Sequence, residues 1–95
     1  MKELYFKIHG RVQGVGFRRF VLKNAQKIGG LSGWVRNAED GTVEVLIKGK
    51  EELVEQMFQV CQKGSLFSRV DKITALPAVK NYFLPQIENG IFRII

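Results

Sequence analysis

The 95-residue sequence has one cysteine, one histidine and two prolines, and it contains no long hydrophobic run. One cysteine cannot form an intramolecular disulfide, and together with one histidine it cannot supply the four ligands of a structural zinc site. No apolar run approaches the roughly 20 residues that cross a membrane. The first residues lack the apolar segment of a signal peptide, so we expect a mature protein that resides in the cytoplasm without a membrane partner.

The composition is typical of a soluble globular protein, with 45% hydrophobic and 25% charged residues. A chain of this length is expected to form one domain, residues 1–95, with a modest hydrophobic core. The net charge of +6 favours anionic partners, either phosphate-bearing substrates or nucleic acid, and does not decide between them.

Hydrophobic periodicity predicts the element order βαββαβ. Alternating residues predict a strand over 2–9, and helical spacing predicts a helix over 17–28 that ends at Gly29-Gly30. Asp40-Gly41 is a hairpin signal between two further strands. Those strands are expected at 31–37 and 42–48, followed by a helix at 50–63 that ends at Gly64. A strand at 69–79 and an apolar segment at 91–95 that suits a short extra strand follow.

A hairpin placed between two helices in this order predicts an α+β sandwich, with one mostly antiparallel sheet and both helices on one face. In the strand 42–48, Val43, Val45 and Ile47 are expected to point inward. Cys61 lies on the apolar side of the second helix and is expected to be buried. His9, on the polar side of the first strand, is expected to be solvated rather than catalytic.

The loop between the first strand and the first helix has the chemistry of an anion site. It reads Gly10-Arg11-Val12-Gln13-Gly14-Val15-Gly16-Phe17-Arg18. Glycines let successive backbone N–H groups converge on one point, and the helix N-terminus adds positive partial charge. Arg18 adds a planar fork of donors that matches phosphate oxygens. The loop matches neither the Walker A pattern nor the dinucleotide Gly-x-Gly-x-x-Gly pattern.

This string resembles the acylphosphatase signature Gly-x-Val-Gln-Gly-Val-x-Phe-Arg at every fixed position, and a second family segment, Gly33-Trp34-Val35-Arg36-Asn37, follows it. The resemblance covers most of residues 4–73 and implies a ferredoxin-like fold. It also implies that the loop amides bind phosphate, that Arg18 is catalytic and that Asn37 orients the attacking water. The implied phosphate-binding residues are Gln13, Gly14, Val15, Gly16, Phe17 and Arg18.

The chain departs from the family pattern at Gly29-Gly30, where members usually have one residue fewer. A loop at a helix end absorbs an added glycine at small cost, so the strand that carries Asn37 is expected to keep its register.

The resemblance implies a metal-independent acylphosphatase, an enzyme that hydrolyses the carboxyl–phosphate bond of small acyl phosphates. No metal and no organic cofactor is expected, and inorganic phosphate is expected to be both product and inhibitor. Two alternatives remain open: a non-catalytic phosphate-binding or regulatory domain of the same fold, and an RNA-binding module, since RNA-recognition domains share the order βαββαβ. The latter stack bases on exposed aromatic side chains of their central strands, where this sequence offers only Tyr5, so nucleic acid is not the expected partner.

Overall fold

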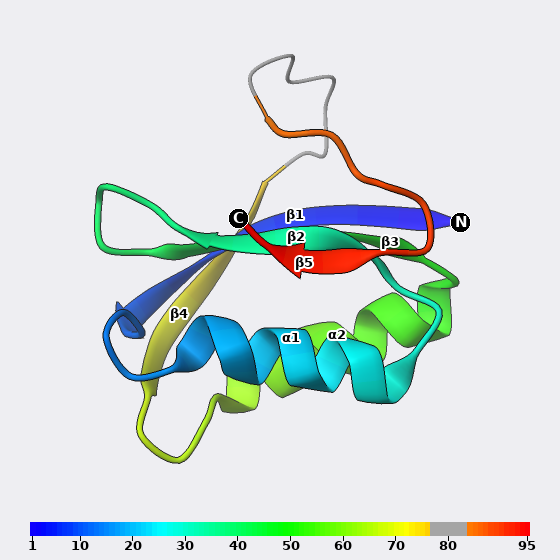
Figure 1. Cartoon of the computed structure of the whole chain (residues 1–95). Coiled ribbons are helices and arrows are strands. Elements are labelled where there is room, and N and C mark those ends of the chain that lie inside the picture. The colour runs from blue at the N-terminus through cyan, green and yellow to red at the C-terminus, as the bar shows by residue number, and fades with distance from the viewer. Residues whose placement is uncertain (77–83) are drawn as a thin grey trace.

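A computed structural model describes residues 1–76 and 84–95, which form a five-stranded sheet with two helices on one face (Figure 1). The strand order across the sheet is β4-β1-β3-β2-β5. All neighbouring strands are antiparallel except β2 and β5, which are parallel. The predicted α+β sandwich is therefore confirmed. Along the chain the elements are β1 (Lys2–Arg11), α1 (Phe17–Ile28), β2 (Ser32–Asn37), β3 (Val43–Gly49), α2 (Glu51–Lys63), β4 (Arg69–Leu76) and β5 (Phe92–Ile94).

Both helices end at the glycines that the sequence indicated. The N–H of Gly29 donates to the carbonyl of Ala25 at 3.0 Å, and the N–H of Gly64 donates to that of Val60 at 3.0 Å. Both glycines have positive φ, which stops the helical hydrogen-bond pattern. Neither helix combines the length and apolar character needed to cross a membrane, within the residues that the structure describes.

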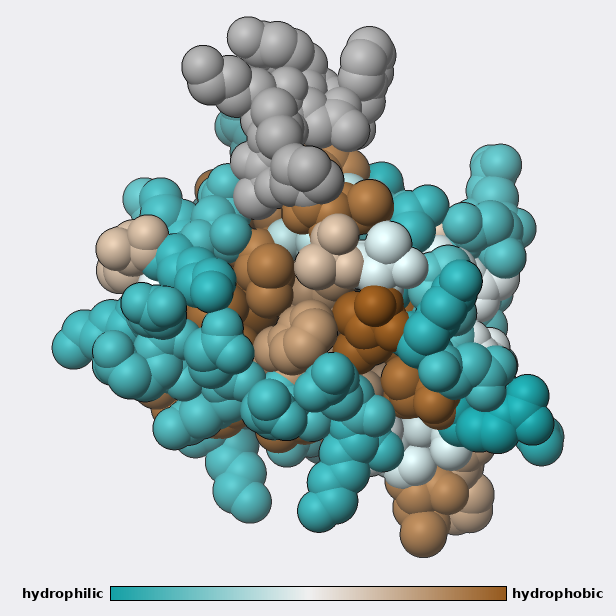
Figure 2. All heavy atoms as spheres, turned by 180° about the vertical axis from the view of Figure 1, so that it is seen from behind, coloured by the Kyte–Doolittle hydropathy of each residue, from teal (hydrophilic) through white to brown (hydrophobic). Residues whose placement is uncertain are grey.

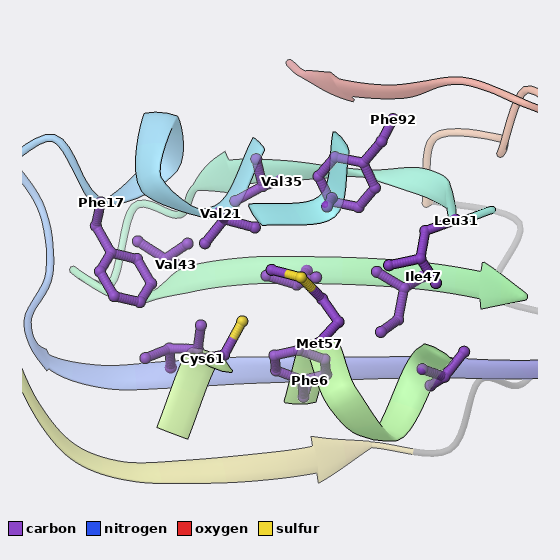
Figure 3. Close-up of a cluster of buried hydrophobic side chains, with 14 of the residues drawn as sticks. Phe6, Phe17, Val21, Leu31, Val35, Val43, Ile47, Met57, Cys61 and Phe92 are labelled. Atoms are coloured by element: carbon purple, nitrogen blue, oxygen red, sulfur yellow. The ribbon is translucent and has the colours of Figure 1, made fainter. Parts of the chain in front are cut away.

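The hydrophobic core lies between the helices and the inner face of the sheet (Figure 3). Val43, Val45 and Ile47 of β3 are fully buried there, as predicted. Cys61 of α2 is also fully buried, and burial raises the pKa of its thiol to about 12. The main contributions from the other elements are Phe6, Ile8, Phe17, Val21, Val35, Val54 and Met57.

The outer face of the sheet is also covered, which the alternation in β1 and β3 did not predict. Tyr5, Trp34 and Leu46 form a second buried cluster on this face. The indole N–H of Trp34 donates to the carbonyl of Pro85 at 2.9 Å, so the segment that begins at Leu84 lies against this cluster. Partly buried Leu76, Leu84 and Ile87 complete the packing.

A polar network continues the outer face beside this cluster. The carboxylate of Glu44 accepts hydrogen bonds from the Tyr5 hydroxyl at 3.0 Å and from Arg36 Nε at 3.1 Å. The Arg36 guanidinium also lies 4.9 Å from the ring centre of Trp34. Burial and the hydrogen bond to Glu44 raise the pKa of Tyr5 to about 12. Tyr5 and Trp34 are both buried, so β1, β2 and β3 expose no aromatic ring among their described residues.

Gly33 allows an unusually close approach of β2 to β3. Its φ is 146°, and a Cβ at this position would collide with the backbone carbonyl of Leu46. Only glycine fits both the dihedral angle and the spacing. The approach fixes the pairing of β2 with β3 over the whole strand, from Ser32 opposite Lys48 to Asn37 opposite Val43.

The last two predicted strands correspond to β4 and β5. β4 is described over Arg69–Leu76, and residues 77–79 of the predicted strand lie outside the described residues. The expected extra strand is β5, which pairs with the edge of β2 and places Ile94 opposite Val35.

Candidate active site

The segment between β1 and α1 forms a tight loop built around two glycines. Gly14 and Gly16 have φ values of 75° and 76°, in the left-handed region that other residues rarely adopt. Gly16 is also the N-cap of α1, and its carbonyl accepts the N–H of Phe20 at 3.0 Å. The loop therefore turns the chain directly into the first turn of the helix, whose first backbone N–H groups have no partner within the helix.

Within the described residues, no side chain caps the N-terminus of α1. The first turn of this helix contains no acidic residue. Arg18 and Arg19 stand there instead, both exposed, and neither forms an ion pair with a carboxylate among residues 1–76 and 84–95. Free helical N–H groups next to unpaired guanidinium groups favour an anionic ligand.

A hollow of about 270 Å³ opens at this helix start. The loop and α1 form one side of it, and the end of β2 together with β5 forms the other. The structure thus brings Arg18 and Asn37 to one concave surface, although 19 positions separate them in the sequence. The lining residues are Val12, Gly14, Gly16, Phe17, Arg18, Arg19, Asn37 and Ile94.

Asn37 is the last residue of β2, and Gly29-Gly30 lies in the connection before that strand. Both glycines have positive φ and lie in the connection, and β2 then pairs with β3 without a register shift. The Oδ1 atom of Asn37 is buried and accepts no hydrogen bond from any residue that the structure describes. A buried acceptor without a donor costs free energy, and the position next to the hollow suits a bound polar group such as water.

The hairpin after Asn37 is held by its own side chains. Asp40 Oδ1 accepts the backbone N–H of Thr42 at 3.0 Å and its hydroxyl at 2.6 Å. Asp40 Oδ2 accepts from Lys7 Nζ of β1 at 3.2 Å. The Thr42 hydrogen bonds, with a smaller contribution from Lys7, hold the pKa of Asp40 well below its usual range.

The hollow does not contain every residue that the sequence assigned to phosphate. The side chain of Gln13 turns away and donates to the hairpin, and Val15 packs partly buried against the core. Sequence reasoning missed Arg19 and Ile94. Arg19 had a signal, as the second arginine in the first helical turn, whereas Ile94 reaches the hollow only through the pairing of β5 with β2.

His9 lies outside the hollow. Its Nε2 atom is 3.2 Å from the hydroxyl oxygen of Thr74 on the neighbouring strand β4. In the part of the chain that the structure describes, no three His, Cys, Asp or Glu side chains gather in a metal-binding arrangement.

The loop between α2 and β4 extends from the same end of the molecule as the hollow. It carries two of the most exposed large hydrophobic residues, Leu66 (90% exposed) and Phe67 (74%). Seen from behind, apolar side chains protrude at the lower edge, where this loop lies (Figure 2). The strand that follows pairs Arg69 with Arg11, so basic side chains flank the apolar loop.

Comparison with known proteins identifies close relatives. A sequence model of the family described as Acylphosphatase matches residues 4–84. The acylphosphatase of Bacillus licheniformis is 53% identical over 66 residues, covering 70% of this chain and 72% of the relative. That of Rhodospirillum rubrum is 46% identical over 77 residues, or 81% and 84% of the two chains. The crystal structure of acylphosphatase from Bacillus subtilis superposes with a TM-score of 0.81 at 36% identity, covering 100% of this chain and 99% of that one.

Proposed function

Because this chain belongs to the acylphosphatase family and is an acylphosphatase enzyme, we propose that it binds the phosphoryl group of a small acyl phosphate in the hollow at the start of α1. The observation that carries this assignment is the pairing, on one concave surface, of an uncapped helix start bearing Arg18 with the unpartnered oxygen of Asn37. The first group suits an anion, and the second suits a neutral polar reactant beside it.

The backbone N–H groups of residues 13–18 hold the non-bridging phosphoryl oxygens. Gly14 and Gly16 support this role, because their positive φ values let the loop curve around a ligand. Arg18 pairs its guanidinium with the same group and stabilises the negative charge of the transition state. A loose phosphoryl-transfer transition state requires mainly such positioning and charge stabilisation.

Asn37 holds the attacking water in line with the scissile P–O bond. Its Oδ1 accepts a hydrogen bond from the water, which directs a lone pair of the water oxygen at phosphorus. The water oxygen forms the new P–O bond, the bond to the acyl oxygen breaks, and the carboxylate leaves with the electron pair. The water proton passes to a phosphoryl oxygen, so this mechanism uses no protein base. A carboxylate is a good leaving group and needs no strong general acid.

Hydrolysis of benzoyl phosphate in the presence of EDTA tests the proposal. We expect turnover that EDTA leaves unchanged and that inorganic phosphate inhibits competitively, because phosphate occupies the same amides and guanidinium. The folded Arg18→Ala protein sets the background rate.

Two results would contradict it. Activity that EDTA abolishes and magnesium or zinc restores would show that the reaction requires a metal ion, which the proposed mechanism omits. Phosphate binding without turnover of any acyl phosphate would instead favour the non-catalytic, regulatory alternative.

A further inference from the structure

The side chain of Gln13 connects the phosphate loop to the β2–β3 hairpin. Its Nε2 atom donates to the carbonyl oxygen of Ala38 at 2.8 Å and to that of Thr42 at 2.9 Å. An amide nitrogen carries two hydrogens, so both are used in these contacts. The bonds are partly buried and join residues 25 and 29 positions apart. A side chain at the start of the loop thus reaches the base of a distant hairpin.

The two carbonyls belong to the residues that close the hairpin. The N–H of Ala38 donates to the carbonyl of Thr42 at 2.9 Å, and the N–H of Gly41 donates to that of Ala38 at 3.2 Å. Gln13 therefore binds the closing turn and not its exposed tip. Ala38 follows Asn37 directly, so the hydrogen bond to its carbonyl fixes the backbone next to the Asn37 side chain.

The sheet pairing of Val43 with Ile8 and with Asn37 holds the strand end. Beyond this pairing, the side-chain contacts from β1 and its loop to the hairpin turn in the described residues are the Gln13 hydrogen bonds and one ion pair. The ion pair of Lys7 with Asp40 joins an exposed carboxylate to a partly exposed ammonium group, and such surface pairs contribute little. The Oδ1 atom of Asn37 accepts no bond from the described residues, so no protein donor orients it. The direction of the Asn37 side chain then depends on where its backbone is held.

We propose that Gln13 is a positioning residue that sets the distance between the bound phosphoryl group and Asn37. Its backbone belongs to the loop that holds the phosphate, and its side chain holds the strand end that carries Asn37. The inference rests on the proposed role of Asn37 in holding the water. In an in-line attack, a displacement of about 1 Å costs up to about 10²-fold in rate, so a fixed distance between the two parts has catalytic value.

A double-mutant cycle of Gln13→Met with Asn37→Ala tests this coupling. Methionine keeps the length of the side chain and removes both donors. We measure kcat, KM for benzoyl phosphate and the inhibition constant of inorganic phosphate for the wild type, both single variants and the double variant. Circular dichroism confirms the fold of each. Gln26→Met on the exposed side of α1 is the matched control and is expected to behave as wild type.

Asn37→Ala is expected to lower kcat by about 10²-fold and Gln13→Met by about 10- to 100-fold, each with little change in phosphate inhibition. In the Asn37→Ala background, Gln13→Met is expected to change kcat by less than about twofold, because the residue it positions is gone.

Three results would overturn the inference alone: an unchanged kcat in Gln13→Met, losses that multiply in the double variant, or phosphate inhibition that weakens in step with kcat. A normal kcat in folded Asn37→Ala would instead refute the water-holding role, and the inference with it. If Gln13→Met does not fold, Gln13→Asn withdraws the same amide by one methylene and enters the cycle in its place.

Discussion

The two helices of this protein begin in opposite electrostatic settings. The first turn of α2 carries Glu51 and Glu52, whose negative charges complement the positive end of that helix. The first turn of α1 carries Arg18 and Arg19 and no acidic residue, which adds positive charge where the helix dipole is already positive. Neither start has a side-chain cap among the described residues. The N-cap of α1 is Gly16 in a left-handed conformation, whereas that of α2 is Lys50 in an extended one.

The two helix starts differ in the source of negative charge. The chain itself supplies this charge at α2, whereas the proposed ligand supplies it at α1. At α2 the two carboxylates interact favourably with the positive end of the helix dipole and so contribute to stability. At α1 the same contribution is absent, and under the proposed function the phosphoryl group of the substrate supplies it from outside. Removing, supplying or exchanging the charge at one helix start, with the other start as reference, tests this contrast.

The largest effect is expected from Arg18→Ala. Loss of a charge partner of the transition state costs about 2.7–4 kcal/mol or more, a factor of at least 10²–10³ in kcat. Arg18→Lys is expected to be nearly as inactive, because an ammonium group cannot replace the planar fork. The comparison variant is Lys23→Ala, which removes an exposed positive charge further along α1. A folded Arg18→Ala protein that retains more than a tenth of wild-type kcat would refute the assignment.

The second effect is stabilisation by inorganic phosphate. At about 100 times its Kd, a ligand that binds only the folded state adds about 2.7 kcal/mol to the free energy of unfolding. We expect this gain in urea unfolding of the wild type and its loss in Arg18→Ala. Sodium chloride at equal ionic strength serves as control. Equal stabilisation by the chloride would show that general screening, and not a phosphate site, is responsible.

Arg19→Glu gives α1 the kind of start that α2 has. The new carboxylate is expected to stabilise the folded state by about 0.3–1 kcal/mol. It also opposes the bound anion with about 1 kcal/mol of repulsion, which weakens phosphate inhibition about fivefold. Stability and affinity should therefore move in opposite directions, measured by urea unfolding and by inhibition kinetics. Lys23→Glu makes the same charge change outside the first turn, and an equal response there would show a general charge effect.

The smallest effect is expected at α2. Removing the charges of Glu51 and Glu52 as glutamines should lower the free energy of unfolding by about 0.3–1 kcal/mol for each residue at low salt. Values of kcat and phosphate inhibition should not change, because neither residue lines the hollow. If kcat fell along with stability, the separation between a stabilising and a ligand-binding helix start would be wrong.

Much of this fold was predictable because short-range signals determine it. The ends of both helices follow from Gly29 and Gly64, and the inner face of β3 follows from period-two alternation. The covering of the outer face was not predictable. Trp34 is buried there, and its indole N–H donates to the Pro85 carbonyl. No periodicity in either segment predicts this contact between residues 51 positions apart.

The residues of the candidate site also differ in whether the local sequence could predict them. The glycines and Arg18 stand in one continuous loop, and a family resemblance supplied Asn37, whose catalytic role stays a prediction. Ile94 enters the hollow through the parallel pairing of β5 with β2, which local sequence does not encode. The hydrogen bonds of the Gln13 side chain were not predictable for a similar reason, because their acceptors are backbone atoms that any residue type provides.

The close approach of β2 to β3 at Gly33 determines what a substitution at this position does in a diverged relative. Gly33 opens the segment that ends in Asn37, yet it has no side chain to offer to chemistry. Any side chain at this position must push β2 away from the Leu46 carbonyl and thereby move the strand that carries Asn37. A descendant gene that keeps both the arginine and the asparagine but replaces this glycine is expected to encode a degenerate enzyme, with the residues proposed for catalysis still present in the sequence and no longer aligned in space.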